Sequence, residues 1–186
     1  MTEQRGKPRL VILDRDGVIN KDSRAFVKTA DEWIPLPGSI EAIASLSAAG
    51  FAIAVASNQS GLARGLVSEA ALRQMHRKLL KLVASEGGQV ELIVICPHGP
   101  DDGCDCRKPK PGLLHQIGAH FAVSVEGVPV IGDSLRDLEA GAAAGSRPIL
   151  VRTGNGSSTA AILPPDLAGV EIYDDLAAAA AALIAE

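Results

Sequence analysis

Short runs of apolar residues alternate along the chain with longer segments in which apolar residues recur at helical spacing. The runs are nearly continuous, which is typical of strands buried on both faces of a sheet. They predict strands at residues 9–14, 51–57, 90–96, 128–132 and 148–152. The longer segments predict helices at residues 39–50, 68–85, 112–121, 135–144 and 175–185. This alternation predicts an α/β fold, with a mainly parallel sheet between two layers of helices.

Residues 68–85 form the clearest amphipathic pattern of the chain. Leu72 and Leu79 fall on the apolar side of this helix, and basic residues that include Lys78 fall on the other. His76 is assigned to the polar face as well. We expect it, like the histidines of the next predicted helix, to lie at the surface or at the edge of the core.

Length and composition narrow the classes of function. A chain of 186 residues is the size of one domain, so we expect residues 1–186 to form one. The net charge of −4 and the 3% of aromatic residues argue against nucleic-acid binding. Residues 42–63 lack charged side chains but contain many polar ones, which favours helix, turn and strand over a membrane span. Arg5 and Lys7 precede an apolar run that is too short for a signal peptide. The sequence shows no long, exposed apolar stripe that would require a partner subunit. We therefore expect a cytoplasmic monomer.

Carboxylates follow two of the predicted strands. Asp14 and Asp16 end the first strand two positions apart, where Gly17 lets the chain turn away, and Asp133 follows the fourth strand. The carboxyl ends of parallel strands meet along one edge of the sheet, so we expect these side chains to lie together. Like charges placed so closely favour a cation between them, and carboxylate oxygens are ligands that Mg²⁺ prefers.

Candidate phosphate-binding groups follow two other strands. Ser57 and Asn58 end the second strand and offer a hydroxyl and an amide, while Lys108 follows the third and supplies a positive charge. The motif DxDGV at residues 14–18, Ser57, Lys108 and the motif GDSxxD at residues 132–137 occur in this order. Together they resemble the haloacid-dehalogenase-like (HAD) superfamily of phosphohydrolases.

This resemblance implies a Rossmann-like three-layer α/β/α fold and a two-step phosphoryl transfer. Asp14 would attack phosphorus to form an aspartyl phosphate, while Asp16 would protonate the leaving oxygen and later activate water. Ser57, Lys108 and Arg107 would act on the phosphoryl group. Asp137 would hold Lys108 or a loop. The ligands of a catalytic Mg²⁺ would be Asp14, the backbone carbonyl of Asp16, and Asp133.

A second cluster contains all three cysteines of the chain. Cys96, His98, Cys104 and Cys106 fall within eleven residues of a loop rich in glycine, proline and aspartate. Three thiols and one imidazole are a closed ligand set for a structural Zn²⁺. A redox-active CxxC pair is absent from the sequence. We therefore predict a zinc-binding loop at residues 96–106, which holds the following Arg107 and Lys108 in place.

The segments between the motifs have room for loops and single helices, so no cap domain is expected. The zinc loop leads directly into the sequence CRKPKPG at residues 106–112, which looks like the D-glycero-D-manno-heptose 1,7-bisphosphate 7-phosphatase family. Further matches to this family lie at residues 14–20, 57–61, 63–65 and 151–154. The resemblance implies a Mg²⁺-dependent enzyme that removes the C7 phosphate to give heptose 1-phosphate, in bacterial lipopolysaccharide-core or nucleotide-activated heptose synthesis.

The same resemblance suggests which residues contact a sugar bisphosphate. They would be Arg15, Asn20, Asp22, Ser57, Asn58, Gln59, Ser60, Arg107, Lys108 and Ser134. Arg64, on a glycine-rich loop, is a further candidate that would meet the distal C1 phosphate. The alternatives are a histidinol-phosphate phosphatase or another small-molecule phosphomonoesterase on the same scaffold, and a binding module without activity. The sequence leaves the choice between the α and β anomers open.

Overall fold

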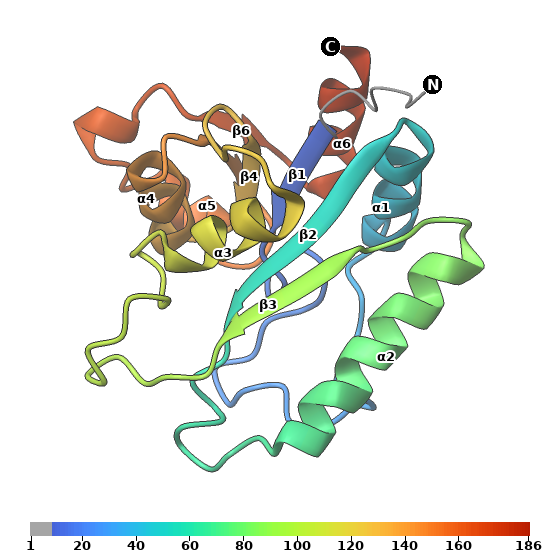
Figure 1. The fold of residues 1–186 in the computed structure, drawn as a ribbon, viewed down its shortest axis with the longest axis vertical. Coiled ribbons are helices and arrows are strands. Elements are labelled where there is room, and N and C mark those ends of the chain that lie inside the picture. The colour runs from blue at the N-terminus through green and yellow to red at the C-terminus, as the bar shows by residue number, and fades with distance from the viewer. Residues whose placement is uncertain (1–8) are drawn as a thin grey trace.

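The computed structural model describes residues 9–186, so Arg5 and Lys7 of the signal-peptide argument lie outside the described residues. Six parallel strands form one sheet in the order β3-β2-β1-β4-β5-β6 (Figure 1). They are β1 (Arg9–Leu13), β2 (Phe51–Asn58), β3 (Leu92–Cys96), β4 (Pro129–Gly132), β5 (Arg147–Val151) and β6 (Glu171–Tyr173). The first five confirm the predicted strands to within two residues at each end. β6 was not predicted, because three half-buried residues at a sheet edge carry little apolar pattern.

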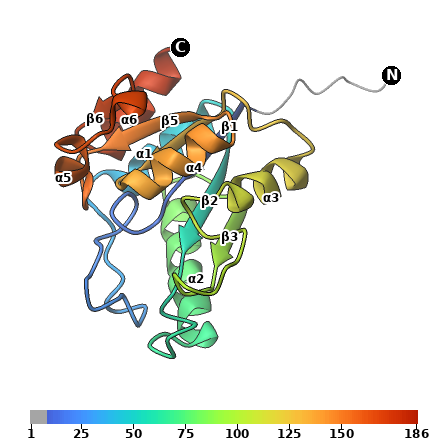
Figure 2. The ribbon, with the colours of Figure 1, turned by 90° about the vertical axis from the view of Figure 1, so that its left-hand side faces the viewer.

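Helices cover both faces of the sheet and complete the predicted three layers (Figures 1 and 2). They are α1 (Ser39–Ala48), α2 (Glu69–Ser85), α3 (Gly112–Phe121), α4 (Leu135–Ala143), α5 (Gly156–Ala160) and α6 (Leu176–Ala185), with a 3₁₀ turn at Pro165–Leu167. Side chains of α1, α2 and α6 share one apolar cluster, and those of α3 and α4 contribute to another. The Ser68 and Asp175 side chains cap the first turns of α2 and α6, as is typical for these residue types.

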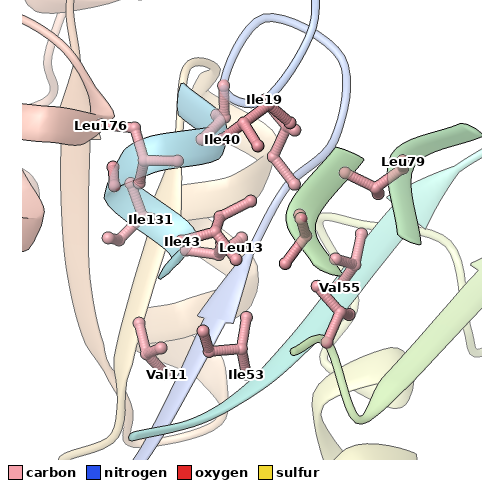
Figure 3. Close-up of a cluster of buried hydrophobic side chains, with 14 of the residues drawn as sticks. Val11, Leu13, Ile19, Ile40, Ile43, Ile53, Val55, Leu79, Ile131 and Leu176 are labelled. Atoms are coloured by element: carbon pink, nitrogen blue, oxygen red, sulfur yellow. The ribbon is translucent and has the colours of Figure 1, made fainter. Parts of the chain in front are cut away.

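The alternation of side chains along β1 explains the two clusters. Val11 and Leu13 point into the cluster beneath α1, α2 and α6, whereas Leu10 and Ile12 point to the opposite face. Figure 3 shows Val11 and Leu13 packed among side chains such as Ile43. All four β1 side chains are at most 4% exposed, and each contributes about 1.5–3 kcal/mol relative to an exposed position. The central strand is thereby fixed, and with it the residues that follow it.

The loops after β1, β2 and β3 gather beyond the same end of the sheet (Figures 1 and 2). β1 and β4 are neighbours, and their connections run to opposite faces, which creates the crevice where such sheets bind ligands. Within residues 9–186, no cap domain is inserted between the strands, and no helix is long and apolar enough to cross a membrane.

The outward orientation predicted for Lys78 is wrong, whereas His76 lies at the edge of the core, one of the two positions expected for it. Lys78 Nζ donates hydrogen bonds to the backbone carbonyls of Ala30 and Trp33, at 2.6 and 2.7 Å. His76 is half-buried, and its Nε2 atom is fully buried. The long segment between β1 and α1 folds against this side of α2, and a helical pattern does not reveal such a partner.

Candidate active site

Lys108 forms the centre of the site and joins two elements that are distant in sequence. Its Nζ atom lies 2.6 Å from Asp14 Oδ1 at the end of β1 and also forms an ion pair with Asp137 in the first turn of α4. A third hydrogen bond goes to the backbone carbonyl of Ala56, at 2.7 Å. The ammonium therefore has all three of its protons assigned, and its position is fixed before any ligand arrives.

Burial disfavours the ionised forms of two carboxylates of the site, Asp14 and Asp133. Burial raises the pKa of Asp14 to about 8, against the opposing charge of Lys108, and the carboxylates nearby reinforce the shift. Burial likewise raises the pKa of Asp133 to about 6. Asp14, Asp133 and Asp137 can bring one oxygen each within 4.8 Å of one another. A divalent cation would stabilise the ionised forms of Asp14 and Asp133, and a set of hard oxygen donors suits Mg²⁺.

Three side chains hold Asp16, and one of them departs from expectation. Arg15 donates to both carboxylate oxygens of Asp16, at 2.9 and 2.8 Å, and Gln59 Nε2 donates to Oδ2 at 2.8 Å. Asn20 Nδ2 donates to Oδ1, also at 2.8 Å. Asn20 was expected to contact substrate, but its side chain is fully buried and does not line the cavity. Burial opposes ionisation of Asp16, yet these hydrogen bonds and the charge of Arg15 hold its pKa below the ordinary value.

Ser57 and Asn58, the last two residues of β2, have different roles. The Ser57 hydroxyl accepts a hydrogen bond from Gln59 Nε2 at 2.8 Å, which leaves its own proton available to an anion. Asn58 was expected to offer its amide to substrate. It lines the cavity, and in addition its Nδ2 donates to the backbone carbonyl of Lys108 and its Oδ1 accepts from the backbone N–H of Lys108, at 3.0 and 3.1 Å. Asn58 thus fixes the main chain that carries the lysine.

Asp133 is enclosed by glycines and by a loop that the sequence analysis did not assign to the site. A Cβ atom on Gly17 or Gly154 would lie 2.1 or 2.2 Å from Asp133 Oδ2, and both glycines have positive φ. The same oxygen accepts from the backbone N–H of Asn155 at 2.7 Å and from its Nδ2 at 3.1 Å. Because Oδ2 has these donors, Oδ1 is the oxygen left for a cation. Asn155 follows the end of β5 by four positions, and this position near a strand end could have predicted that it lies at the site.

These groups surround a cavity of about 330 Å³. Its lining contains most of the predicted residues, namely Asp14, Arg15, Asp16, Asp22, Ser57, Asn58, Gln59, Ser60, Arg64, Arg107, Lys108, Asp133, Ser134 and Asp137. Phe26, Arg136 and Asn155 also line it and were not predicted. The guanidinium of Arg64 lies 5.9 Å from the centre of the Phe26 ring, a cation–π distance. Besides Arg15, the lining thus contains three arginines that lie outside the strands, Arg64, Arg107 and Arg136.

The predicted zinc ligands come together beside this cavity. Cys96 Sγ lies 3.7 Å from Cys104 Sγ and 3.6 Å from His98 Nδ1, which is 3.3 Å from Cys106 Sγ. In a tetrahedral site with bonds of about 2.0–2.3 Å, neighbouring ligand atoms are about 3.5–3.8 Å apart. Burial and the adjacent thiols raise the pKa of Cys106 to about 12, so a cation is needed to hold several thiolates here. The cluster fits Zn²⁺.

The zinc cluster is connected to the cavity through its own ligands. Arg107 Nη1 donates to the backbone carbonyl of His98 at 3.2 Å, so a ligand residue helps to place the arginine at the cavity wall. His115 and His120 are exposed on α3, as predicted, and lie outside both clusters.

A parallel sheet with an aspartate at the end of its central strand, a lysine paired to it, and a ring of further carboxylates defines a HAD-like phosphohydrolase. The HAD-hydrolase-like family model matches residues 105–179. A curated relative from Pseudomonas aeruginosa, named D-glycero-beta-D-manno-heptose-1,7-bisphosphate 7-phosphatase, is 59% identical over 94% of this chain and 97% of its own. One of the same name from Neisseria meningitidis is 49% identical over 81% of each chain. The chain therefore belongs to the D-glycero-D-manno-heptose-1,7-bisphosphate 7-phosphatase family.

A solved structure supports the same assignment. The D,D-heptose 1,7-bisphosphate phosphatase from Bordetella bronchiseptica, complexed with magnesium and phosphate, is 54% identical to this chain. The two structures align with a TM-score of 0.91 over 95% of this chain and 98% of the other.

Proposed function

We propose that this protein hydrolyses the C7 phosphate of D-glycero-β-D-manno-heptose 1,7-bisphosphate and releases heptose 1-phosphate. The observation that carries the proposal is the preformed contact of Lys108 with Asp14 at the inner end of the cavity, in a chain 59% identical to a relative named for this reaction. The names of the relatives specify the β anomer, and on that ground we choose β over α.

In the first step, an Asp14 carboxylate oxygen attacks phosphorus, and the bond from phosphorus to the sugar oxygen breaks. Asp16 gives its proton to that oxygen, so the sugar leaves as an alcohol. Lys108 and the free hydroxyl proton of Ser57 stabilise the charge on the phosphoryl oxygens. Both groups are already in place, because Asp137 and Gln59 hold them.

In the second step, Asp16 takes a proton from water, whose oxygen attacks phosphorus and releases inorganic phosphate and the Asp14 carboxylate. The lowered pKa of Asp16 suits it to this role as a base. For the first step it must carry a proton, and an arriving phosphate anion raises the proton affinity of a carboxylate beside it. Asp16 would thus act as an acid while the sugar phosphate is bound and as a base after the sugar has left.

We propose that Asp14, the backbone carbonyl of Asp16, and Asp133 hold Mg²⁺ here. When bound, the ion would offset the repulsion between a carboxylate nucleophile and an anionic phosphate. The Bordetella phosphatase, 54% identical to this chain, is complexed with both magnesium and phosphate in its crystal structure. Cys96, His98, Cys104 and Cys106 would hold a structural Zn²⁺ whose effect on the reaction is indirect, through Arg107 and Lys108.

The mouth of the cavity would bind the rest of the substrate. Asp22, Ser60 and Ser134 line the cavity with carboxylate and hydroxyl groups suited to sugar hydroxyls. Arg107 would contact phosphate or hydroxyl oxygens. Arg64 would meet the distal C1 phosphate, since it lines the cavity and forms no ion pair with another described residue.

We further propose a monomer of one domain that acts in the cytoplasm. Its product would enter the synthesis of activated heptose for the lipopolysaccharide core. The small cavity and its oxygen-rich lining favour a small-molecule substrate. A histidinol-phosphate phosphatase is the alternative function, because it would use the same catalytic groups on the same scaffold.

The test is kcat/KM, measured with Mg²⁺, for the β and α heptose bisphosphates and for histidinol phosphate. We expect the β bisphosphate to be preferred by tenfold or more, which corresponds to about 1.4 kcal/mol of transition-state discrimination. A preference for the α anomer would overturn the choice of the β anomer and the assignment of the product to the lipopolysaccharide core. A preference for histidinol phosphate would overturn the assignment of the mouth residues to a sugar.

A further inference from the structure

Phe26 is held in a backbone conformation that bulky residues rarely adopt. Its φ is 65°, in the left-handed region, and its N–H closes a turn by donating to the carbonyl of Ser23 at 3.0 Å. A residue with a Cβ atom is strained there, and such strain persists only where the surrounding structure compensates for it. Strained residues cluster at ligand sites, and Phe26 lines the cavity. The contacts of the Phe26 ring show where the compensation comes from.

The ring packs against the loop that follows β2, residues 59–67. Gly61 of this loop is buried, and a Cβ atom on it would lie 3.2 Å from Phe26 Cδ1 and 2.8 Å from Val67 Cγ2. A side chain at position 61 would therefore displace the ring or Val67. Phe26 and Leu62 both pack against the apolar cluster that contains Val67. The absence of a side chain on Gly61 thus lets the aromatic ring of one loop lie close to the main chain of another.

The same loop carries Arg64, three residues after Gly61. The guanidinium of Arg64 lies 5.9 Å from the centre of the Phe26 ring, within cation–π distance. Arg64 is exposed and lines the cavity, and it forms no ion pair with another described residue. An arginine side chain has many rotamers, so ordering it when an anion binds costs entropy. A contact with the Phe26 ring reduces this cost, because it orders the side chain before the anion arrives.

The shape of a guanidinium allows it to bind a ring and an anion at once. Its planar face can lie on an aromatic ring, whereas its five N–H donors point outward from the edge. A phosphate accepts two hydrogen bonds from that edge. The Phe26 ring therefore does not compete with a phosphate for Arg64.

We propose that Phe26 is a positioning residue for recognition of the distal phosphate. Its ring holds the Arg64 guanidinium at the cavity wall, so that the N–H edge is in place when a sugar bisphosphate binds. The proposal rests on the proposed function in assigning the second phosphate of the substrate to Arg64. It adds that the loop after β1, which carries Phe26, and the loop after β2 together select a bisphosphate over a monophosphate. The contact acts on binding rather than on the chemical step, so its loss changes KM and leaves kcat.

Substitution separates this role from packing. Phe26→Leu keeps an apolar side chain beside Val67 but removes the aromatic face, and we expect KM for the heptose bisphosphate to rise about fivefold while kcat stays unchanged. KM for heptose 7-phosphate, which lacks the distal phosphate, should stay unchanged as well. Phe26→Tyr retains the aromatic face and should behave as the wild type. Phe121→Leu is the matched control, because Phe121 is also half-buried but lies on α3, outside the cavity lining.

A double-mutant cycle tests whether Phe26 acts through Arg64. Once Arg64→Ala has removed the guanidinium, Phe26→Leu should change KM for the bisphosphate no further, so the two substitutions are non-additive. A ring that only supported the loop would affect the Arg64→Ala enzyme as much as the wild type. Melting temperatures of the same variants detect any loss of stability.

The order of the Arg64 side chain gives a readout that does not depend on activity. In ¹⁵N-labelled protein, the Nε–H signal of Arg64 is identified by its loss in Arg64→Ala, and relaxation measurements give its order parameter. We expect Phe26→Leu to lower this order parameter. Phe26→Tyr and Phe121→Leu should leave it unchanged.

The outcomes decide the proposal in either direction. A rise in KM that is confined to the bisphosphate, absent from the Arg64→Ala background and accompanied by a more mobile Arg64 supports it. An unchanged KM in Phe26→Leu overturns it, and so do an equal loss for both substrates and an additive double variant. If the wild-type protein hydrolyses no heptose bisphosphate, the proposed function fails. The Arg64 order parameter in Phe26→Leu then supports the positioning contact when it falls and overturns it when it does not change.

Discussion

Lys108 Nζ and Asp14 Oδ1 lie 2.6 Å apart, although the two residues are 94 positions apart in the sequence. The side chains are 4% and 11% exposed, so the pair is almost entirely removed from water. Asp137 forms a second ion pair with the Lys108 ammonium. Asp14 and Asp137 therefore fix the Lys108 ammonium at the position where it can stabilise the negative charge that develops on a phosphoryl group.

Lys108→Met should therefore affect both activity and stability. We expect kcat to fall roughly 10²–10³-fold, the size of effect seen when one transition-state donor is lost. The free energy of unfolding should fall by about 3–5 kcal/mol, because two buried carboxylates lose their counterion. Steady-state kinetics and urea unfolding measure the two effects. The double variant Lys108→Met/Asp137→Asn should regain part of the stability and none of the activity. Recovery of activity would contradict the role given to Lys108.

Asp14→Asn should abolish turnover while leaving the fold intact. The amide cannot form the covalent intermediate, whereas its size matches that of the carboxyl group. In the absence of divalent metal, we expect the variant to be at least as stable as the wild type near neutral pH. The raised pKa of Asp14 shows that ionisation there is unfavourable. Hydrolysis and thermal unfolding measure both effects, and appreciable residual hydrolysis would refute a covalent mechanism.

The strands, and the strand-end residues that line the cavity, were predictable because each follows from a local pattern. A buried parallel strand requires a continuous apolar run, and the residue after it lies at the edge where ligands bind. Asp14, Ser57 and Asp133 could therefore be placed at this edge without coordinates. Lys108 stands twelve positions after the end of β3, and the order of the motifs, not a strand end, predicted its place. The zinc cluster was predictable for another reason, since its ligands lie close together in sequence.

What the sequence could not show is which polar side chains support others. Asn20 and Asn58 stand in motifs that resemble substrate contacts, yet one holds Asp16 and the other holds the backbone of Lys108. An amide can serve a ligand or the chain equally well, and only the packing of distant segments decides. The burial of His76 has the same origin, because its partner segment precedes α2 by dozens of residues.

Removal of zinc should loosen the loop that carries Arg107. A zinc-selective chelator, used with excess Mg²⁺, should lower both the melting temperature and kcat/KM, since binding to the folded state alone stabilises it. Cys106→Ser should reproduce the effect. Asp105→Ala is a matched control, because this exposed neighbour pairs only with Lys110. Unchanged melting and rate after verified zinc loss would exclude a structural role for the metal.

Arg64→Ala tests the binding of the distal phosphate. A charged hydrogen bond contributes about 1.5–3 kcal/mol, so we expect kcat/KM for the bisphosphate to fall roughly 10- to 100-fold. The value for heptose 7-phosphate, which lacks the C1 phosphate, should change little. Arg73→Ala is the control, since its side chain pairs with Glu69 on the exposed face of α2. An equal effect on both substrates would remove Arg64 from the recognition of the second phosphate.

His76 should make stability depend on pH in a defined window. The folded state holds its pKa at about 4, below the ordinary value of 6.5, so between these values the unfolded chain binds a proton that the folded protein does not. Stability therefore falls as pH decreases from about 6.5 to 4 and levels off below, where both states are protonated. The imidazole is only partly buried, and solvent reduces the magnitude.

His76→Leu isolates this contribution from the other titrating groups. The difference in unfolding free energy between wild type and variant, measured by urea unfolding from pH 7.5 to 4, should be constant above pH 7. It should then shift steadily in favour of the variant on acidification. A difference that stays flat across the range would contradict the lowered pKa of His76 in the folded protein.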